Sequence, residues 1–371
     1  MEISSEDALR LNVLLANVPR AIRIHESSMT LYGLFETGES SVKLNPSCSD
    51  EKYLKLIRAF LSDRALGSPG GYPFYLQRWT RMGRMREDSL ERLLLLGDPS
   101  AVFAVVCAEG LTSELARRAW WAAEEAENAR RMLQTREVVQ SDTGPLLARY
   151  LVEYLPFESV SEIMVESVRM ALQPGLLDES ERLALWKKAS RKTPYLVGFI
   201  AADPSGLPEQ LPSRGDLNLH QARLNGVNPE GDELSMLLLK LLSGSGQTFI
   251  STCRRILGKP TTQDVVTTTL DVLCAFCSAA RPDGDGASSI GQLLAEADGF
   301  LSTPKAGRIL ERDKELSEEL KAVRILSGLG RDVTRSLLGD SSAIGSLMRR
   351  KLEPLLTQAT GLFDILLGQK P

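Results

Sequence analysis

Hydrophobic residues in the first 66 positions of the chain follow two different periods. Three stretches alternate or cluster as strands do, and a stretch on either side of them has helical spacing. The strand-like stretches are 21–25, 29–35 and 41–44, and the helical ones are 6–16 and 51–61. This pattern predicts a small α+β unit over residues 1–66 that contains an antiparallel meander. A core of this size is marginal alone, so we expect the unit to pack on the residues that follow.

After residue 86 the hydrophobic residues recur almost only at helical spacing. Apolar residues at i, i+1, i+4 and i+5 give a helix a stripe wide enough to contact neighbours on two sides. One such set is Leu146, Leu147, Tyr150, Leu151, Tyr154 and Leu155. We therefore predict a predominantly α-helical protein with a HEAT-like stacked helical array over residues 87–203, a linker rich in Pro, Gly and Asn over 204–228, and a C-terminal helical domain over 229–371. In the last helix, Pro354 predicts a kink.

A short pattern occurs twice in the helical region. Gly110 and Gly175 each precede a Leu, a helix-capping residue and then a tryptophan, Trp120 or Trp186. The offset is 175 − 110 = 65 residues, about the length of two helix pairs. The pattern favours stacked repeats, with chance similarity in a leucine-rich helical chain as the alternative.

Residues 67–86 form the junction between the two regions and have an unusual composition. Glycines and prolines open the stretch, and aromatic residues then alternate with four arginines that no acid opposes before Glu87. The arginines could bind phosphate or carboxylate groups while the aromatic rings stack beside them. Alternatively, the aromatic rings are buried between the α+β unit and the array. Under the first interpretation the binding residues are Tyr72, Tyr75, Arg78, Trp79, Arg81, Arg84 and Arg86.

Trp121 is an eighth candidate binding residue. It follows Trp120 directly, and successive helical residues lie about 100° apart, so both rings cannot point into the same core. Trp121 is therefore expected in a groove between helices or at a partner surface, or as a wedge between repeats.

Composition narrows the classes of function. The net charge of −4 argues against a dedicated nucleic-acid binder, although a local basic patch is compatible with it. The N-terminus lacks the order of a secretion signal, and no apolar run reaches the ~18 residues of a membrane span. The five cysteines are scattered and do not resemble a disulfide framework. We expect a cytoplasmic protein, and the oligomeric state is left open.

The motifs that resemble catalytic or metal sites are incomplete. Cys274 and Cys277 have C-x-x-C spacing but no further ligands nearby, which favours two buried small side chains. The stretch from Gly244 to Thr248 lacks the lysine of a phosphate loop and predicts a turn between helices. His25 and His220 stand alone, the latter in the predicted linker. Acids such as Asp313 and Glu319 lie among basic residues, which predicts a solvated face. No catalytic residue, metal site or cofactor is predicted.

Several longer motifs resemble the DsrS family, which is encoded with the dissimilatory sulfite reductase genes of sulfur-oxidising bacteria. The resemblance is continuous over about the first 200 residues and weaker beyond Asp203. Its motifs are residues 7–17, 67–83 (GSPGGYPFYLQRWTRMG), 115–121 (LARRAWW), 126–133 (AENARRML) and 173–176 (QPGL). The resemblance implies a cytoplasmic accessory protein of sulfur oxidation without assigned catalytic residues.

These observations favour a non-enzymatic accessory or regulatory protein of dissimilatory sulfur metabolism that acts through protein contacts. One alternative is a nucleic-acid-binding regulator that uses the junction arginines. Another is a sulfur carrier or enzyme that uses a cysteine thiolate.

Overall fold

The computed structural model describes residues 3–67, 87–224, 233–282, 289–330, 333–334, 337 and 345–369. The chain forms two compact units, Met1–Tyr154 with Gln173–Leu177 and Leu155–Leu172 with Asp178–Pro371. The division expected from the sequence at residues 203 and 229 stays a prediction. The predominantly helical fold with a small N-terminal α+β unit is confirmed.

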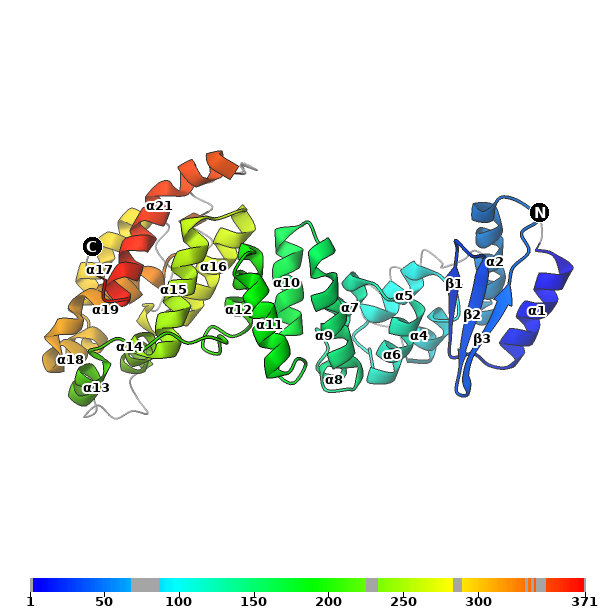
Figure 1. Cartoon of the computed structure of the whole chain (residues 1–371), viewed down its shortest axis with the longest axis horizontal. Coiled ribbons are helices and arrows are strands. Elements are labelled where there is room, and N and C mark those ends of the chain that lie inside the picture. Colours follow the sequence, from blue (N-terminus) through cyan, green and yellow to red (C-terminus); the bar gives the residue numbers. More distant parts are fainter. Residues whose placement is uncertain are drawn as a thin grey trace. The chain divides into compact units, whose positions relative to one another are not determined.

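The first unit begins with the predicted α+β arrangement (Figure 1). Helices α1 (Ser5–Ala16) and α2 (Asp50–Leu66) flank strands β1 (Ala21–His25), β2 (Thr30–Phe35) and β3 (Gly38–Lys43). The strands form an antiparallel sheet in the order β1-β2-β3, with Ile22 and Ser40 both paired to Gly33. The meander and both helices are thus confirmed. Their core contains Leu11, Leu14, Ile22, Leu31, Leu44, Tyr53 and Ile57.

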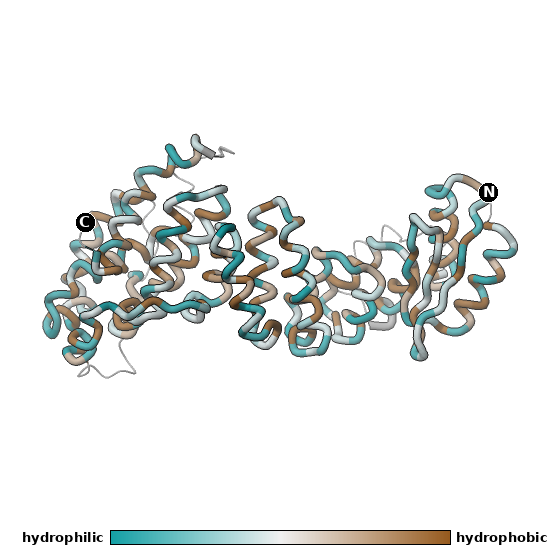
Figure 2. Tube along the Cα trace, in the orientation of Figure 1, coloured by the Kyte–Doolittle hydropathy of each residue, from teal (hydrophilic) through white to brown (hydrophobic). Residues whose placement is uncertain are grey.

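Six short helices complete the first unit. They are α4 (Glu87–Leu93), α5 (Pro99–Val106), α6 (Ser113–Ala122), α7 (Ala126–Met132), α8 (Arg136–Val139) and α9 (Thr143–Tyr154) within the described residues. Helices close in the chain pack side by side, as α5 does on α6, and α9 on both α7 and α8. In Figure 2 hydrophobic positions recur along these helices between hydrophilic ones, as the amphipathic pattern predicts.

The second unit is helical throughout its described part. It contains η1 (Leu155–Phe157), α10 (Ser161–Ala171), α11 (Glu179–Ala189), α12 (Thr193–Ala202), α13 (Leu217–Leu224), α14 (Glu233–Leu242), α15 (Gly244–Gly258), α16 (Gln263–Phe276), η2 (Ser278–Ala280), α17 (Ile290–Phe300), α18 (Pro304–Arg312), η3 (Lys314–Leu316), α19 (Ser317–Leu326) and α21 (Gly345–Leu366). Pro354 lies inside α21, which continues through it.

The repeated sequence pattern has the same structural role in both units. Thr112 caps α6 and Asp178 caps α11, and each side chain accepts a hydrogen bond from the backbone three residues later. The tryptophan of each helix then packs edge-on against an aromatic ring of a later helix. Trp120 meets Tyr150 at 4.7 Å between ring centroids, and Trp186 meets Phe199 at 5.0 Å. This similarity favours the repeat interpretation.

Two local predictions in the second unit need correction. The predicted linker 204–228 contains helix α13, whose buried face consists of His220 and Leu224. The sequence does not predict this helix because its flanks are polar and rich in Gly and Pro. Gly244 and Gly246 do not form a turn but lie in the first turn of α15, whose N-cap is Ser243. A Cβ at Gly246 would lie 2.1 Å from the carbonyl oxygen of Lys240, so glycine allows α15 to start directly against the end of α14.

Candidate functional site

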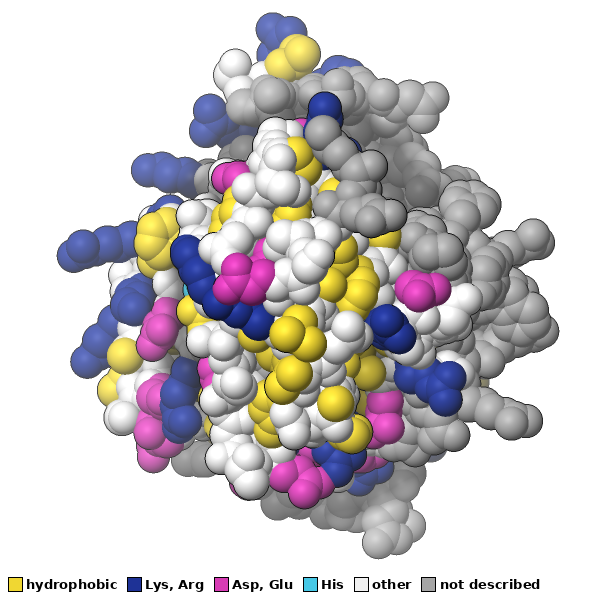
Figure 3. Space-filling model, turned by 90° about the vertical axis from the view of Figure 1, so that its right-hand side faces the viewer, with side chains coloured by type: hydrophobic (Ala, Val, Ile, Leu, Met, Phe, Trp, Pro, Cys, Tyr) yellow, Lys and Arg dark blue, Asp and Glu magenta, His cyan; other side chains and the backbone are white. Residues whose placement is uncertain are grey.

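A groove of about 910 Å³ lies between α1 and the edge strand β3. Its volume falls in the range of ligand-binding clefts. Figure 3 shows this face of the molecule, where hydrophobic side chains run across the centre between basic and acidic ones. The groove is lined by Leu9, Arg10, Val13, Leu14, Asn17, Val18, Arg20, Phe35, Glu36, Thr37, Ser40, Ser41, Val42 and Lys43.

Helix α1 presents apolar side chains in two directions. Leu11 and Leu14 are buried in the core of the α+β unit. Leu9 and Val13, one helical turn apart, are 66% and 57% exposed and border the groove, and Val18 beyond the helix is 72% exposed. Contiguous exposed apolar side chains beside a cleft are a feature of protein interaction surfaces.

Val18 adopts a backbone conformation that disfavours its side chain. Its φ of 54° lies in the left-handed region, and Val18 is branched at Cβ and precedes Pro19. A residue in the left-handed conformation just after a helix is usually glycine, since glycine avoids the clash of Cβ with the following carbonyl. A valine held there with its side chain in water costs stability, and such costs concentrate at binding and switch sites.

The N-terminal half of α1 is fixed against the rest of the α+β unit. The buried carboxylate of Asp7 accepts hydrogen bonds from the Tyr53 hydroxyl at 2.5 Å and from the Asn45 amide at 2.9 Å. Arg10 donates to the carbonyl oxygen of Lys43 at 3.5 Å. Burial and the bond to Asp7 raise the pKa of Tyr53. These contacts attach the N-terminal half of α1 to α2 and to the Lys43 end of β3.

Trp121 lies on the other side of β3 from the groove. Its Nε1 donates to Glu39 at 2.5 Å, and the Arg23 guanidinium stacks over its ring at 4.5 Å. Arg23 also donates to the carbonyl oxygen of Trp121 at 3.3 Å. Trp121 thus joins α6 to the sheet and is half-buried. The other seven candidate residues, Tyr72, Tyr75, Arg78, Trp79, Arg81, Arg84 and Arg86, lie outside the described residues.

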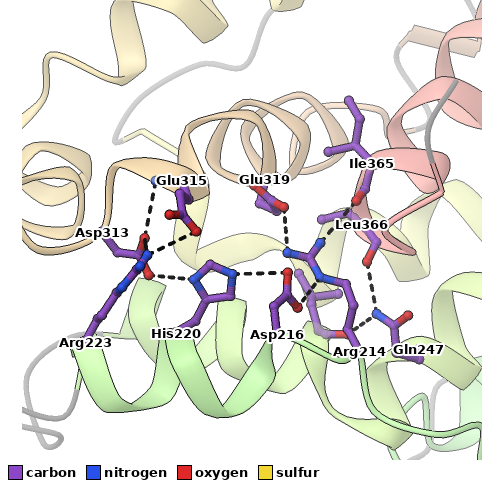
Figure 4. Close-up of polar contacts among 11 residues, drawn as sticks. Arg214, Asp216, His220, Arg223, Gln247, Asp313, Glu315, Glu319, Ile365 and Leu366 are labelled. Atoms are coloured by element: carbon purple, nitrogen blue, oxygen red, sulfur yellow. Dashed lines mark hydrogen bonds and ion pairs between the residues drawn. The ribbon is translucent and has the colours of Figure 1, made fainter.

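A second cluster of charged residues lies inside the second unit (Figure 4). His220 is 2% exposed, and its Nδ1 is 2.5 Å from Oδ2 of Asp313 while its Nε2 is 3.3 Å from Asp216. Arg223 donates to Asp313 at 2.9 Å and lies 3.1 Å from Glu315. Burial alone would raise the pKa of Asp313, but the bonds to His220 and Arg223 outweigh it and lower that pKa.

The same cluster extends to the end of the C-terminal helix. Arg214 binds Asp216 at 2.7 Å and Glu319 at 2.8 Å, and it donates to the carbonyl oxygen of Ile365 in α21 at 3.2 Å. Gln247 donates to the next carbonyl, that of Leu366, at 3.0 Å. The prediction of a solvated face is therefore wrong for Asp313 and Glu319, which are 1% and 7% exposed. They are buried because their cationic partners, Arg223 in α13 and Arg214 just before it, are 90 and 105 residues away in the chain.

This cluster has the donor set of a cation site but already contains a cation. Ligand atoms of His220, Asp313 and Glu315 lie within 4.8 Å of one another, the one such group among the residues the structure describes. The Arg223 guanidinium lies on both carboxylates, so a metal ion would have to displace it. The arrangement suits a closed ion-pair network that joins α13, η3, α19 and α21.

The cysteines differ widely in exposure. Cys253 and Cys277 are fully buried, and burial raises the pKa of both thiols, that of Cys277 to about 12. Cys274 is buried beside Arg281 and the carbonyl oxygen of Ser327. Cys107 is exposed, although partial burial of its thiol raises its pKa. Thiolates are thus disfavoured at Cys107, Cys253 and Cys277.

The groove residues were not predicted as a site from the sequence. Leu9 and Val13 contribute with Leu11 and Leu14 to the prediction of a helix over 6–16, and that prediction does not say which of them are buried. The available signal was that apolar residues at 9, 11, 13, 14 and 15 surround α1 too widely for one core.

No family model, curated protein or solved structure matches this chain. In the described residues, no helix combines the length and the apolar character needed to cross a membrane.

Proposed function

We propose that this chain is a non-enzymatic binding protein that holds a segment of a partner protein in the groove between α1 and β3. The observation that carries this proposal is a groove in which Leu9, Val13 and Val18 are exposed beside the edge of a sheet. Burial of these three side chains would contribute binding free energy at about 25 cal/mol per Å² of apolar surface. The strained Val18 backbone adds support, since a glycine would otherwise suit this position better.

The biological setting follows from the resemblance to the DsrS family. It supports an accessory role in dissimilatory sulfur metabolism in the cytoplasm, with the partner among the proteins of that process. The nucleic-acid alternative depends on Arg78, Arg81, Arg84 and Arg86, which lie outside the described residues, so it stays a prediction. The thiolate alternative is not favoured by the raised pKa values of Cys107, Cys253 and Cys277.

Site-specific photo-crosslinking in cells tests the proposal. A photoreactive amino acid replaces Val13 in the full chain, and a matched control carries it at Leu219, which is 46% exposed in the second unit. Cells grown on reduced sulfur compounds are irradiated and the products are identified by mass spectrometry. We expect a defined protein crosslinked from Val13 and not from Leu219. The same products from both positions, or none from Val13, would overturn the proposal, and a product unrelated to sulfur oxidation would overturn the setting.

A further inference from the structure

We infer that the groove binds its partner as an extended segment that pairs with β3 as a fourth strand, with alternate apolar and acidic side chains. This inference rests on the proposed function and specifies the conformation and chemistry of the bound segment. It follows from three features of the groove, which are the free backbone edge of β3, the two faces of that strand and the charges around the groove.

The outer edge of β3 carries free backbone groups. The amide of Leu44 donates to the carbonyl oxygen of Met29, so Leu44 faces β2, whereas the carbonyl of Lys43 faces away from β2 and binds Arg10. Because backbone groups alternate in direction along a strand, those of Ser41 and Glu39 also face away from β2. Within the described part of the chain, no group bonds the amide or carbonyl of either residue.

Strand geometry at the other end of the ladder agrees with this assignment. The amide of Arg20 donates to the carbonyl oxygen of Leu34, so Leu34 faces away from β3. Its pairing with Glu39 is therefore a non-hydrogen-bonded one, and the backbone groups of Glu39 face outward. An extended segment can thus form a ladder with Glu39 and Ser41, which satisfies groups that an edge strand leaves open.

The two faces of β3 differ in polarity. Val42 packs against the core beside the groove, and Ser40, two residues away, lies on the same face. Glu39, Ser41 and Lys43 lie on the opposite face. A fourth strand continues both faces, so alternate side chains would contact Val13, Val18 and Val42 while the others face water beside Lys43. This alternation requires a sequence in which apolar and polar residues take turns.

The charges around the groove favour acidic polar positions. The lining residues include the cations Arg10, Arg20 and Lys43 but only one acid, Glu36. Glu36 pairs with Arg20, and Glu6 pairs with Arg10 at 2.5 Å, but all four side chains are 39% exposed or more. Ion pairs this exposed contribute little and can be exchanged for others. An acidic residue on the face of the added strand that lies beside Lys43 can therefore bind the Lys43 ammonium group.

The other occupants fit the groove less well. A helix lying in the groove would bury the amides of Glu39 and Ser41 without giving them partners, which is costly. If β3 of a second copy paired with β3 of the first, the α1 helix of the second copy would have to occupy the space beside α1 of the first. A single strand of about six residues matches the six residues of β3 and meets neither difficulty.

Fluorescent octapeptides added to the full chain test the inference by anisotropy. The probe is a capped peptide in which valine alternates with glutamate and serine. One control peptide replaces glutamate with lysine, a second is methylated on the amides that would pair with β3, and a third has the same composition arranged as an amphipathic helix. We expect the first peptide to bind at least tenfold more tightly than each of the controls.

Two variants of the protein locate the binding. Val13→Asp should abolish binding of the valine-glutamate peptide, and the matched variant Leu219→Asp should bind as the unmodified chain does. Ser41→Pro removes an outward amide and leaves the ladder with β2 intact, so it should weaken binding at least tenfold while the circular dichroism spectrum is unchanged.

The possible failures separate the inference from the proposed function. Equal affinity for the methylated peptide, or tighter binding of the helical one at Val13, would overturn strand addition and leave protein binding at the groove in place. Concentration-dependent dimers that Val13→Asp abolishes would make a second copy the occupant and overturn the inference. Absence of binding by any peptide, together with no crosslink from Val13, would overturn both.

Discussion

The hydroxyl of Tyr53 donates a hydrogen bond of 2.5 Å to Oδ2 of Asp7, and both residues are fully buried. The bond joins α2 to the first turn of α1 and so fixes the position of the helix that forms one wall of the groove. The other carboxylate oxygen of Asp7 has no hydrogen-bond partner among the described residues. Asp7 therefore depends on Tyr53 and the Asn45 amide for compensation of its burial.

Tyr53→Phe should lower the free energy of unfolding by about 1–3 kcal/mol, because a buried carboxylate would lose one of its two donors. Urea denaturation at pH 7 measures this loss. Tyr32→Phe in β2 is the control, since no hydrogen bond of the Tyr32 hydroxyl is found in the described residues. We expect a change below about 0.5 kcal/mol. Equal effects of the two substitutions would show that the Asp7 bond contributes nothing.

Asp313 should make the stability of the protein depend on acid pH. Its pKa is lower in the folded protein, where hydrogen bonds to His220 and Arg223 outweigh burial, than in the unfolded chain. The stabilisation is thus present above the ordinary carboxyl pKa of about 4 and is lost as the pH falls through the lower folded value.

Asp313→Asn should remove this part of the acid dependence and cost about 3–5 kcal/mol at pH 7, because His220 and Arg223 lose a buried partner. Urea unfolding at several pH values between 3 and 7 measures both effects. Glu318→Gln is the matched control, since Glu318 is 61% exposed and its pairing with Lys321 is long, at 3.5 Å. An unchanged slope of stability against pH in Asp313→Asn would contradict the assignment.

The parts of the fold that local sequence determines could be predicted. Helix caps such as Asp98, Thr112 and Thr262 have a local sequence signature, because a cap depends only on the next three residues. The meander could be predicted because its strands alternate and its turns are short. The packing of Trp121 on the sheet could not, since Glu39 and Arg23 are 82 and 98 residues away in the chain.

Burial of charge was the main feature that the sequence concealed. Asp313 and Glu319 have the same local surroundings as exposed acids of the same region, and only the distant partners His220 and Arg214 explain their burial. The groove was concealed for a related reason, since apolar spacing in α1 does not say which of its faces the core covers. The positive φ of Val18 could not be predicted either, because valine normally avoids this conformation.

Arg214 should hold the end of α21 in place. Arg214→Met removes the partner of the buried Glu319 and the donor to Ile365, and we expect a loss of about 3–5 kcal/mol in unfolding free energy. Hydrogen exchange should also become faster in the last turn of α21. Lys55→Met is the control, because its ion pair with Glu51 is exposed, lies in α2 and should be worth less than about 1 kcal/mol. Equal exchange in the two variants would exclude this role of Arg214.

Val18→Gly should stabilise the protein while it weakens binding. Glycine relieves the left-handed strain at φ 54°, and we expect a gain of about 1 kcal/mol in urea denaturation. The same substitution at Val13, inside α1, should instead cost about 1 kcal/mol. Both variants remove an apolar side chain from the groove and should bind the valine-glutamate octapeptide more weakly. A destabilised Val18→Gly protein would show that the valine is not strained.

Thiol labelling of the native protein should separate the cysteines by burial. Cys107 is exposed and should react first of the three at pH 8, although its raised pKa slows it relative to a free thiol, whereas Cys253 and Cys277 are fully buried. Because burial raises the pKa of Cys277 to about 12, almost none of it is thiolate at this pH, and it should react only after denaturation. Mass spectrometry of tryptic peptides after timed exposure to iodoacetamide assigns each rate, with protein in urea as the control. Fast alkylation of Cys277 in the native protein would revive the thiolate alternative, since it would require an opened and deprotonated site.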